Sequence, residues 1–254
     1  MEKHQLIERS IIKKYRKTIW NNFVAAIKDY ELIREGDKIA VCISGGKDSL
    51  ALLSALSEMR RFYPKKYEVV AITVDMGFEG MDYSPIADFC KAKNVEYIIE
   101  KTEIAKIIFD VRKEPNPCSL CAKMRRGSLH AAAQAAGCNK VALGHHYDDA
   151  VETFMMNLFN EGRIGCFSPV TYLDRKDITL IRPLIYAPEN YISGFARRFE
   201  LPIVQNRCPE DKRTKREYIK NLVWQLEREN PGFKTRLFTA MEGGKVGGFG
   251  DFPK

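Results

Sequence analysis

The sequence predicts an α/β fold in which a parallel sheet is flanked by helices, with helical additions at both ends of the chain. Short apolar runs typical of buried strands alternate with longer helical patterns, as expected of repeated βαβ units. A serine- and glycine-rich turn follows the first apolar run directly, as in sheets that bind phosphates. A length of 254 residues suits one large domain of this kind and is too short for two.

The first predicted element is a long amphipathic helix. Apolar residues recur every four positions from Ile7 to Ile27, which places them along one face, and Gly36 can end the helix. We therefore expect residues 1–36 to form an N-terminal helical arm. The simplest role of its apolar stripe is to pack on the domain that follows.

Residues 37–206 are expected to form the sheet domain. Its strands are predicted at the apolar runs 38–43, 68–74, 96–99, 140–143, 180–181 and 202–204. Its helices are predicted at 50–59, from Pro85 onward with Ser84 as the N-cap, in the alanine-rich stretch that Gly137 ends, and at 189–199. Residues 207–254 are expected to form a basic C-terminal helical segment, with a helix over 214–229 and a loose, glycine-rich tail over 243–254.

The net charge of +8 is concentrated in two segments. Residues 1–20 carry a net charge of +4 and residues 207–220 a net charge of +3. Clusters of Lys and Arg bind polyanions by releasing phosphate counterions, but two solvated helix faces explain the same pattern equally well. The sequence has no apolar run of about 18 residues and no leader-like start, so we expect a cytoplasmic protein without a membrane partner.

The turn after the first predicted strand, Ser44 to Ser49 (SGGKDS), lies where parallel sheets place their ligands. Its two glycines let the backbone approach an anion, and the amino end of the following helix favours negative charge. The GxxxxGK[ST] spacing of a Walker A loop is absent. The turn resembles the PP-loop of the N-type ATP pyrophosphatases, which implies that it grips the pyrophosphate of ATP while a substrate attacks the α-phosphorus. The ATP-binding residues expected in it are Ser44, Gly45, Gly46, Lys47, Asp48 and Ser49.

A second polar motif, GHHYDD at 144–149, follows the fourth predicted strand and should open onto the same edge of the sheet. Carboxylates that face a triphosphate are best explained by Mg²⁺, and we assign this role to Asp149 in preference to Asp148. His145 and His146 are expected to orient neighbouring groups rather than to bind metal.

The resemblance to the PP-loop enzymes adds further candidates. Gly144 begins a GHxxDD-like motif that the family shares, and Asp75 matches an acidic position near the nucleotide, although a turn aspartate at a strand end is nearly as good an explanation. Arg163 and Arg182 could neutralise developing phosphate charge, or be ordinary surface arginines. The expected catalytic residues are Lys47, Asp48 and Asp149.

The seven cysteines form an odd set in a chain without an export signal, which favours reduced thiols, metal ligands or redox chemistry over disulfides. Cys118 and Cys121 form a CxxC pair, and this pair alone is ambiguous between a metal site, redox chemistry and chance. The cysteines expected to be small buried hydrophobic residues are Cys42, Cys90, Cys138 and Cys166.

Four ordered segments sharpen this interpretation: CSLCAKMRRG at 118–127, GHHYDDAVETFMMNLFNEGR at 144–163, IRPL at 181–184 and ENPGFKTRLFTAM at 229–241. Together they resemble the TtcA family of tRNA 2-thiocytidine synthetases, from about Asp37 to Met241. The resemblance implies a PP-loop fold, which is adenine nucleotide alpha-hydrolase-like and Rossmann-like. It also implies ATP-dependent thiolation of a pyrimidine 2-carbonyl in tRNA, with cytidine as the first candidate.

In that family three cysteines hold a [4Fe-4S] cluster, and here Cys118, Cys121 and Cys208 are available to match. Better-known members carry a second CxxC downstream, whereas this chain has Gln205 in place of its first cysteine. Three thiolates leave one iron without a protein ligand, and hydrosulfide could sit there. Zinc, which normally takes four protein ligands, and a cysteine persulfide remain alternatives.

The resemblance also implies tRNA as a partner, together with a sulfur donor (a cysteine desulfurase or free sulfide) and a possible homodimer. The residues expected to bind RNA are Lys123, Arg125, Arg126, Lys212, Arg213, Lys215 and Arg216. Two rival functions stay open. One is a PP-loop enzyme that uses nitrogen instead of sulfur, such as a lysidine-type tRNA ligase, and the other is a non-enzymatic protein that binds ATP or RNA.

Overall fold

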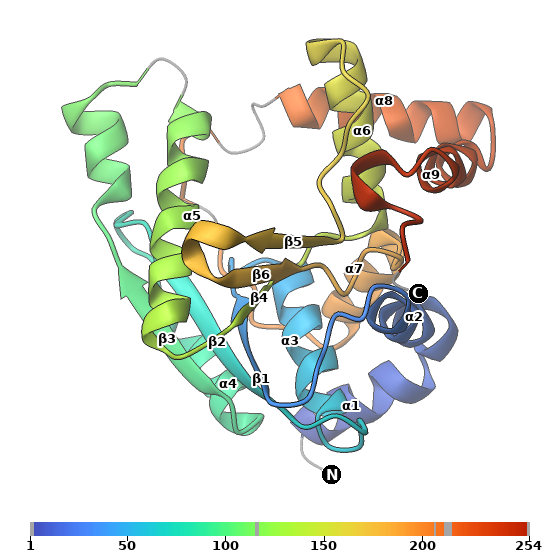
Figure 1. Cartoon of the computed structure of the whole chain (residues 1–254). Coiled ribbons are helices and arrows are strands. Elements are labelled where there is room, and N and C mark those ends of the chain that lie inside the picture. The colour runs from blue at the N-terminus through green and yellow to red at the C-terminus, as the bar shows by residue number, and fades with distance from the viewer. Residues whose placement is uncertain (1–2, 115–116, 206, 211–214, 253–254) are drawn as a thin grey trace.

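The computed structural model contains a six-stranded sheet in the order β3-β2-β1-β4-β6-β5 (Figure 1). It describes residues 3–114, 117–205, 207–210 and 215–252. The strands are β1 (Asp37–Cys42), β2 (Tyr67–Asp75), β3 (Glu96–Lys101), β4 (Lys140–Ala142), β5 (Val170–Leu173) and β6 (Ile178–Ile181). All neighbouring pairs are parallel except the edge pair of β5 and β6, so the predicted parallel α/β fold is confirmed.

Helices cover both faces of the sheet (Figure 1). The α-helices are α1 (Lys3–Lys13), α2 (Asn21–Asp29), α3 (Lys47–Met59), α4 (Ser84–Ala92), α5 (Pro117–Ala135), α6 (Tyr147–Glu161), α7 (Glu189–Arg198), α8 (Lys215–Glu229) and α9 (Phe233–Gly243). Short helical turns lie at η1 (Arg16–Trp20), η2 (Lys106–Val111), η3 (Asp174–Lys176) and η4 (Val246–Gly248). Among the helices of the described residues, none is both long enough and apolar enough to cross a bilayer.

The core divides into two layers because side chains alternate along each strand. Ile39 and Val41 of β1 face the larger layer, which includes α3 and the N-terminal arm. Ala40 of the same strand faces a smaller layer, in which Leu129 and Ala133 of α5 pack. Both faces of the central strands are therefore buried, which explains why these strands appear in the sequence as continuous apolar runs.

The N-terminal arm differs from the single helix that the sequence predicts. The buried side chains Ile7, Ile11, Phe23 and Ile27 confirm the apolar stripe, but the π-helical turn η1 separates α1 from α2, and α2 ends before Tyr30. A four-residue repeat drifts by about 40° per repeat around an α-helix. A π turn takes up more residues per turn, so it brings the stripe back toward the core.

Three further predictions about the elements are wrong. Residues 202–204 form no strand, and β5, which the sequence analysis missed, occupies the sheet edge instead. The tail is not loose over its described part, because Phe249 is fully buried and the Gly250 N–H donates to the Tyr30 hydroxyl. At α4, Pro85 occupies the first turn as expected, but the helix begins at Ser84 itself rather than after it.

Candidate active site at the carboxyl edge of the sheet

Two polar segments meet where the strand order reverses on either side of β1. The loop Ser44 to Ser49 leaves the carboxyl end of β1, and the segment 144–149 follows the neighbouring strand β4. A Cβ atom on Gly144 would lie 3.1 Å from the Ser49 nitrogen, which is tighter than most Cβ contacts, so this close approach favours glycine. Open parallel sheets bind their ligands at such a crevice.

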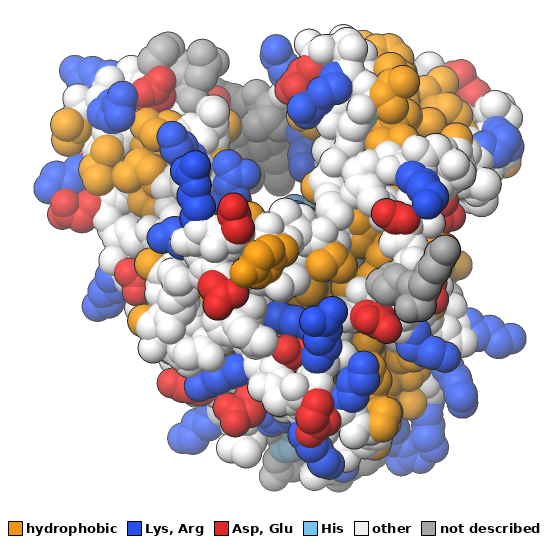
Figure 2. All heavy atoms as spheres, viewed as in Figure 1, with side chains coloured by type: hydrophobic (Ala, Val, Ile, Leu, Met, Phe, Trp, Pro, Cys, Tyr) orange, Lys and Arg blue, Asp and Glu red, His pale blue; other side chains and the backbone are white. Residues whose placement is uncertain are grey.

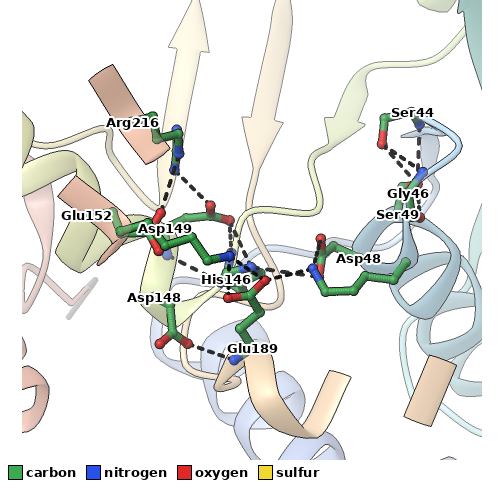
Figure 3. A network of polar contacts seen from close by, with 12 residues as sticks. Ser44, Gly46, Asp48, Ser49, His146, Asp148, Asp149, Glu152, Glu189 and Arg216 are labelled. Atoms are coloured by element: carbon green, nitrogen blue, oxygen red, sulfur yellow. Dashed lines mark hydrogen bonds and ion pairs between the residues drawn. The ribbon is translucent and has the colours of Figure 1, made fainter. Parts of the chain in front are cut away.

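The loop after β1 is shaped by its own hydroxyl groups. Ser49 Oγ donates to the Gly46 carbonyl at 2.9 Å, and the Gly46 N–H donates to Ser44 Oγ at 3.3 Å (Figure 3). Gly45 adopts a left-handed conformation with φ of +82°, which favours glycine. Its carbonyl accepts a hydrogen bond of 3.0 Å from the Val204 N–H, which ties the segment before Cys208 to the loop.

Asp149 and His146 form a reciprocal cap at the start of α6. The His146 N–H donates to Asp149 Oδ2 at 2.9 Å, and the Asp149 N–H donates to His146 Nδ1 at 3.3 Å. The second ring nitrogen of His146, Nε2, lies 3.5 Å from Asp149 Oδ2 and 3.7 Å from Asp48 Oδ1 (Figure 3). Burial raises the pKa of Asp149, but the neighbouring His146 and Arg216 outweigh it and hold that pKa below its usual value.

Asp48 leaves one acceptor atom available to a ligand. Its Oδ2 accepts from Lys47 Nζ at 3.0 Å, whereas its buried Oδ1 has no hydrogen-bond partner among the residues that the structure describes. A buried carboxylate oxygen without a partner is costly unless a cation or donor binds it. Asp149 supplies a second carboxylate to the same pocket, and two carboxylates beside a phosphate-binding loop are oxygen donors of the kind that Mg²⁺ takes.

Glu189, at the start of α7, connects the loop to the C-terminal helices. Its carboxylate accepts from Lys47 Nζ and from Lys220 Nζ of α8, both at 2.9 Å. Burial raises the pKa of Glu189, but the two ammonium groups lower it much further, to about 2. Asp148 has a different role, because it accepts from the Glu189 N–H at 2.7 Å and from Lys234 Nζ of α9 at 2.6 Å.

A single pocket of about 430 Å³ joins these groups to the cysteines. Its lining includes Lys47 and Asp48 from the loop, Asp149 from α6 and Arg216 from α8, together with the thiols of Cys118, Cys121 and Cys208. In the space-filling view the molecule is hollowed between the side of α5 and the side of α6 and α8, and Lys and Arg side chains border this hollow (Figure 2). The two motifs and the CxxC pair, which are far apart in the sequence, therefore share one site.

The three thiols form a soft donor set on one side of this pocket. Burial raises the pKa of Cys121, the nearby Arg125 opposes this effect, and Cys208 and Cys118 are close enough to raise the pKa further. In the described part of the chain, no three His, Cys, Asp or Glu side chains converge on a single metal ion. A cubane cluster presents a separate iron to each thiolate, so its ligands stand further apart than those of one ion, and the three cysteines fit such a group.

The PP-loop domain family matches residues 13–227 of this sequence. This range covers most of the chain. The chain belongs to the PP-loop family.

Within this PP-loop family, two curated relatives are named tRNA-cytidine(32) 2-sulfurtransferase. The protein from Geobacter sulfurreducens is 42% identical over 231 residues, which cover 90% of each chain. The protein from Geobacter metallireducens is 43% identical over 232 residues, again 90% of each chain. The predicted resemblance to the TtcA family is thus confirmed, and the chain is a member of the same group.

A solved PP-loop structure is also similar. The U34-tRNA thiolase NcsA from Methanococcus maripaludis, with its [4Fe-4S] cluster, superposes with a TM-score of 0.74 at 27% sequence identity. The similarity covers 88% of this chain and 77% of that chain. It confirms the fold class of the sheet domain.

Several predicted site residues lie outside the pocket of this PP-loop chain. Asp75 ends β2 and accepts from the Gly77 N–H at 3.0 Å, as a turn aspartate does. The exposed Arg163 pairs with Glu161 at 3.6 Å. The buried Arg182 donates to the Ser168 carbonyl and stacks on Phe167 at 4.9 Å.

Of the basic residues expected to bind RNA, some line the pocket and others lie on the exposed surface outside it. Arg125 and Arg216 line the pocket, whereas Lys123, Arg126 and Lys215 are exposed residues outside its lining. Two more of the predicted RNA-binding residues, Lys212 and Arg213, lie outside the described residues.

The charged side chains Glu152, Glu189 and Lys220 line the pocket and were not predicted from the sequence, and the same holds for Met76, Ala122, Glu210 and Glu217. A signal existed for Glu152, because it lies three positions after Asp149 and thus on the same face of a helix. Glu189 and Lys220 belong to separate helices, and no local pattern links them to the loop.

The buried Glu152 carboxylate predicts a specific pH dependence. Burial raises its pKa to about 7, Arg216 opposes this shift, and Asp149 adds to it. Because this folded-state pKa exceeds the unfolded value of about 4.3, the folded protein binds more protons, and stability falls as pH rises from about 4 to about 7. We expect Glu152→Gln to flatten this part of the melting-temperature profile. The exposed Glu79→Gln, outside the pocket lining, is the matched control, and parallel profiles for wild type and Glu152→Gln would contradict the prediction.

Proposed function

We propose that this chain is an ATP-dependent tRNA sulfurtransferase that replaces a pyrimidine 2-carbonyl oxygen, first of all that of cytidine, with sulfur. One observation carries the proposal: Lys47 and Asp48 of the loop after β1, the Asp149 carboxylate and three cysteines line a single pocket. The printed names of the curated relatives, tRNA-cytidine(32) 2-sulfurtransferase, support the same nucleoside. A nitrogen-using ligase or a plain nucleotide-binding protein would leave the three thiols without a role.

Activation is the first step of the proposed reaction. The carbonyl oxygen is a poor leaving group and must be activated before sulfur can replace it. It attacks the α-phosphorus of ATP, and pyrophosphate departs. Lys47 would neutralise phosphate charge, and the amino end of α3 would present its N–H groups to the pyrophosphate. Hydrosulfide then attacks C2, AMP leaves with the former carbonyl oxygen, and loss of the proton on sulfur gives the 2-thiocarbonyl.

The residues present also indicate which groups the protein would hold. Asp48 and Asp149 would bind Mg²⁺, which shields the phosphates and polarises the α-phosphoryl group. Cys118, Cys121 and Cys208 would hold a [4Fe-4S] cluster, which when bound offers one iron without a protein ligand to an external sulfur species. The solved thiolase with its [4Fe-4S] cluster supports this assignment.

The RNA would enter between α5 and α8. Arg125 and Arg216 line the pocket from these two helices, and Lys123, Arg126 and Lys215 lie near them in the sequence on the exposed surface. Single-stranded loops are the usual targets of sequence-specific RNA recognition because their bases can be splayed out into a pocket. We further propose a cytoplasmic location, a cysteine desulfurase or free sulfide as the sulfur source, and a homodimer.

Two measurements test the function together. Anaerobically purified protein, incubated with tRNA, Mg²⁺, sulfide and labelled ATP, should release AMP and pyrophosphate, and mass spectrometry of the digested tRNA should show 2-thiocytidine. Release of ADP and phosphate would reject the PP-loop chemistry. Pyrophosphate release that yields a nitrogen-modified nucleoside would favour the ligase alternative.

A further inference from the structure

We propose that Arg216 acts as an internal counter-ion that Mg²⁺ and ATP displace, and that the released guanidinium then binds a phosphate of the tRNA. Nucleotide binding would thereby strengthen RNA binding. The inference rests on the proposed function for the identity of the two ligands. It assigns to one side chain a link between the two binding events.

Arg216 holds two carboxylates of the site at once. Its Nη2 donates to Asp149 Oδ1 at 2.8 Å, and its Nε lies 3.5 Å from Glu152 Oε2 (Figure 3). The Asp149 and Glu152 side chains are only 19% and 6% exposed, whereas the Arg216 side chain is 40% exposed. The guanidinium therefore covers the carboxylates from the pocket side and still reaches solvent.

The cation and Arg216 would compete for the same oxygen atom. Asp149 Oδ2 already accepts from the His146 N–H at 2.9 Å and lies 3.5 Å from His146 Nε2, which leaves Oδ1 as the oxygen for a cation, and this is the atom that Arg216 holds. Mg²⁺ takes oxygen ligands at short distances and demands a strict geometry. A divalent ion at Asp149 would also repel a guanidinium beside it, which favours displacement of the arginine over sharing.

The released side chain has a suitable destination near the pocket mouth. Arg216 lies in the first turn of α8, and Arg125 lines the same pocket from α5. A guanidinium presents paired donors that match two phosphate oxygens. An RNA strand that enters between the two helices would offer such phosphates, and the phosphates of ATP are the competing destination that the experiment separates.

The first arm of the experiment needs no RNA. Binding of an ATP analogue with a non-cleavable α–β linkage is measured by calorimetry at several Mg²⁺ concentrations. If Arg216 competes with the cation, Arg216→Met should bind the Mg²⁺–analogue complex about 10-fold more tightly than wild type, within the usual range of couplings between sites. Weaker binding by Arg216→Met would overturn the proposal and assign Arg216 to the nucleotide phosphates.

The second arm measures the affinity for tRNA at constant Mg²⁺, with and without the analogue. Wild type should gain about 10-fold in affinity with the analogue, within the usual range of couplings between sites. Arg216→Met should gain none, because it has no guanidinium to release to the RNA. A wild-type affinity that ignores the analogue would overturn the link. A complete lack of tRNA binding would reject the proposed function instead, while the first arm would still decide the competition.

Arg228→Met is the matched control. Arg228 is also on α8, but its guanidinium stacks on the Trp224 ring at 4.9 Å and makes no described contact with the carboxylates of the site. This variant removes the same charge and should keep the wild-type response in both arms. Arg216→Lys keeps the positive charge but loses the paired N–H donors of the guanidinium. Its affinities in both arms should lie between those of wild type and those of Arg216→Met. If Arg216→Lys shows the same two affinities as Arg216→Met, the paired donors of the guanidinium carry the effect and the positive charge does not. If Arg216→Lys shows the same two affinities as wild type, the proposed role of the guanidinium geometry is contradicted.

Discussion

Replacing Cys208 with alanine is expected to abolish tRNA thiolation while ATP binding is retained. Cys208 lines the same pocket as Cys118 and Cys121, and a cubane cluster held by two thiolates would be lost. Changes to groups that merely support a metal ligand already cost about 10- to 100-fold, so the loss of a ligand should exceed that range. Iron content and the visible absorption of anaerobically purified protein provide a readout that does not depend on activity.

Cys138→Ala is the matched control for this experiment. Cys138 is buried in the core layer beneath α5, outside the pocket lining, so its removal should leave the iron content unchanged. Full activity of Cys208→Ala would reject the assignment of the third ligand. Zinc without iron after anaerobic reconstitution of the wild type would reject the cluster itself in favour of the zinc alternative.

The second large effect is expected at Asp149. Asp149→Asn keeps an oxygen that can accept from the His146 N–H but removes the charge that would hold Mg²⁺. Metal polarisation of a phosphoryl group contributes several kcal/mol, which corresponds to about 10²- to 10³-fold in rate. Pyrophosphate release should fall by this factor and recover in part at high Mg²⁺ concentration.

The neighbouring Asp148→Asn separates catalysis from stability. Asp148 is bonded to the Glu189 N–H and to Lys234, so it links α6 to α7 and α9 rather than facing the expected cation. Its replacement should lower the melting temperature and leave pyrophosphate release per folded molecule close to wild type. Equal losses of turnover in both variants would contradict the distinction between the two aspartates.

The central sheet could be predicted because its strands are buried on both faces. The run of β1 is largely apolar and is followed by a glycine-rich turn, so the hydrophobic pattern and the turn residues predict the same strand and the same strand end. β5 escaped prediction because it is a short edge strand with the polar Thr171 and the exposed Tyr172, and its place depends on pairing with β6. The buried tail escaped for a similar reason, since Phe249 packs against Phe238 and not against its neighbours in sequence.

The candidate site was predictable where its residues lie in short motifs. The loop before α3 (44–49) and the segment that caps α6 (144–149) each place glycines, hydroxyls or carboxylates within six consecutive residues, so their phosphate- or metal-binding chemistry can be recognised in the sequence. The ion pairs of Glu189 and Arg216 were not visible, because each joins helices that only the packing of α7 and α8 brings together. Arg182 was predicted as a candidate phosphate-binding residue from its residue type alone. In the structure its guanidinium donates to the Ser168 carbonyl and stacks on the Phe167 ring instead.

The hydrogen bond from the Val204 N–H to the Gly45 carbonyl holds the nucleotide loop next to the segment that leads to Cys208. It joins main-chain atoms, so the separation between the nucleotide loop and the segment that leads to Cys208 does not depend on which side chains occupy that segment. Side chains in this segment, such as that of Gln205, can therefore be replaced without moving the Val204 backbone away from the nucleotide loop. An inserted or deleted residue between Val204 and Cys208 would change the reach of this connection by up to about 3.5 Å, a displacement large enough to uncouple the proposed activation from the proposed sulfur transfer.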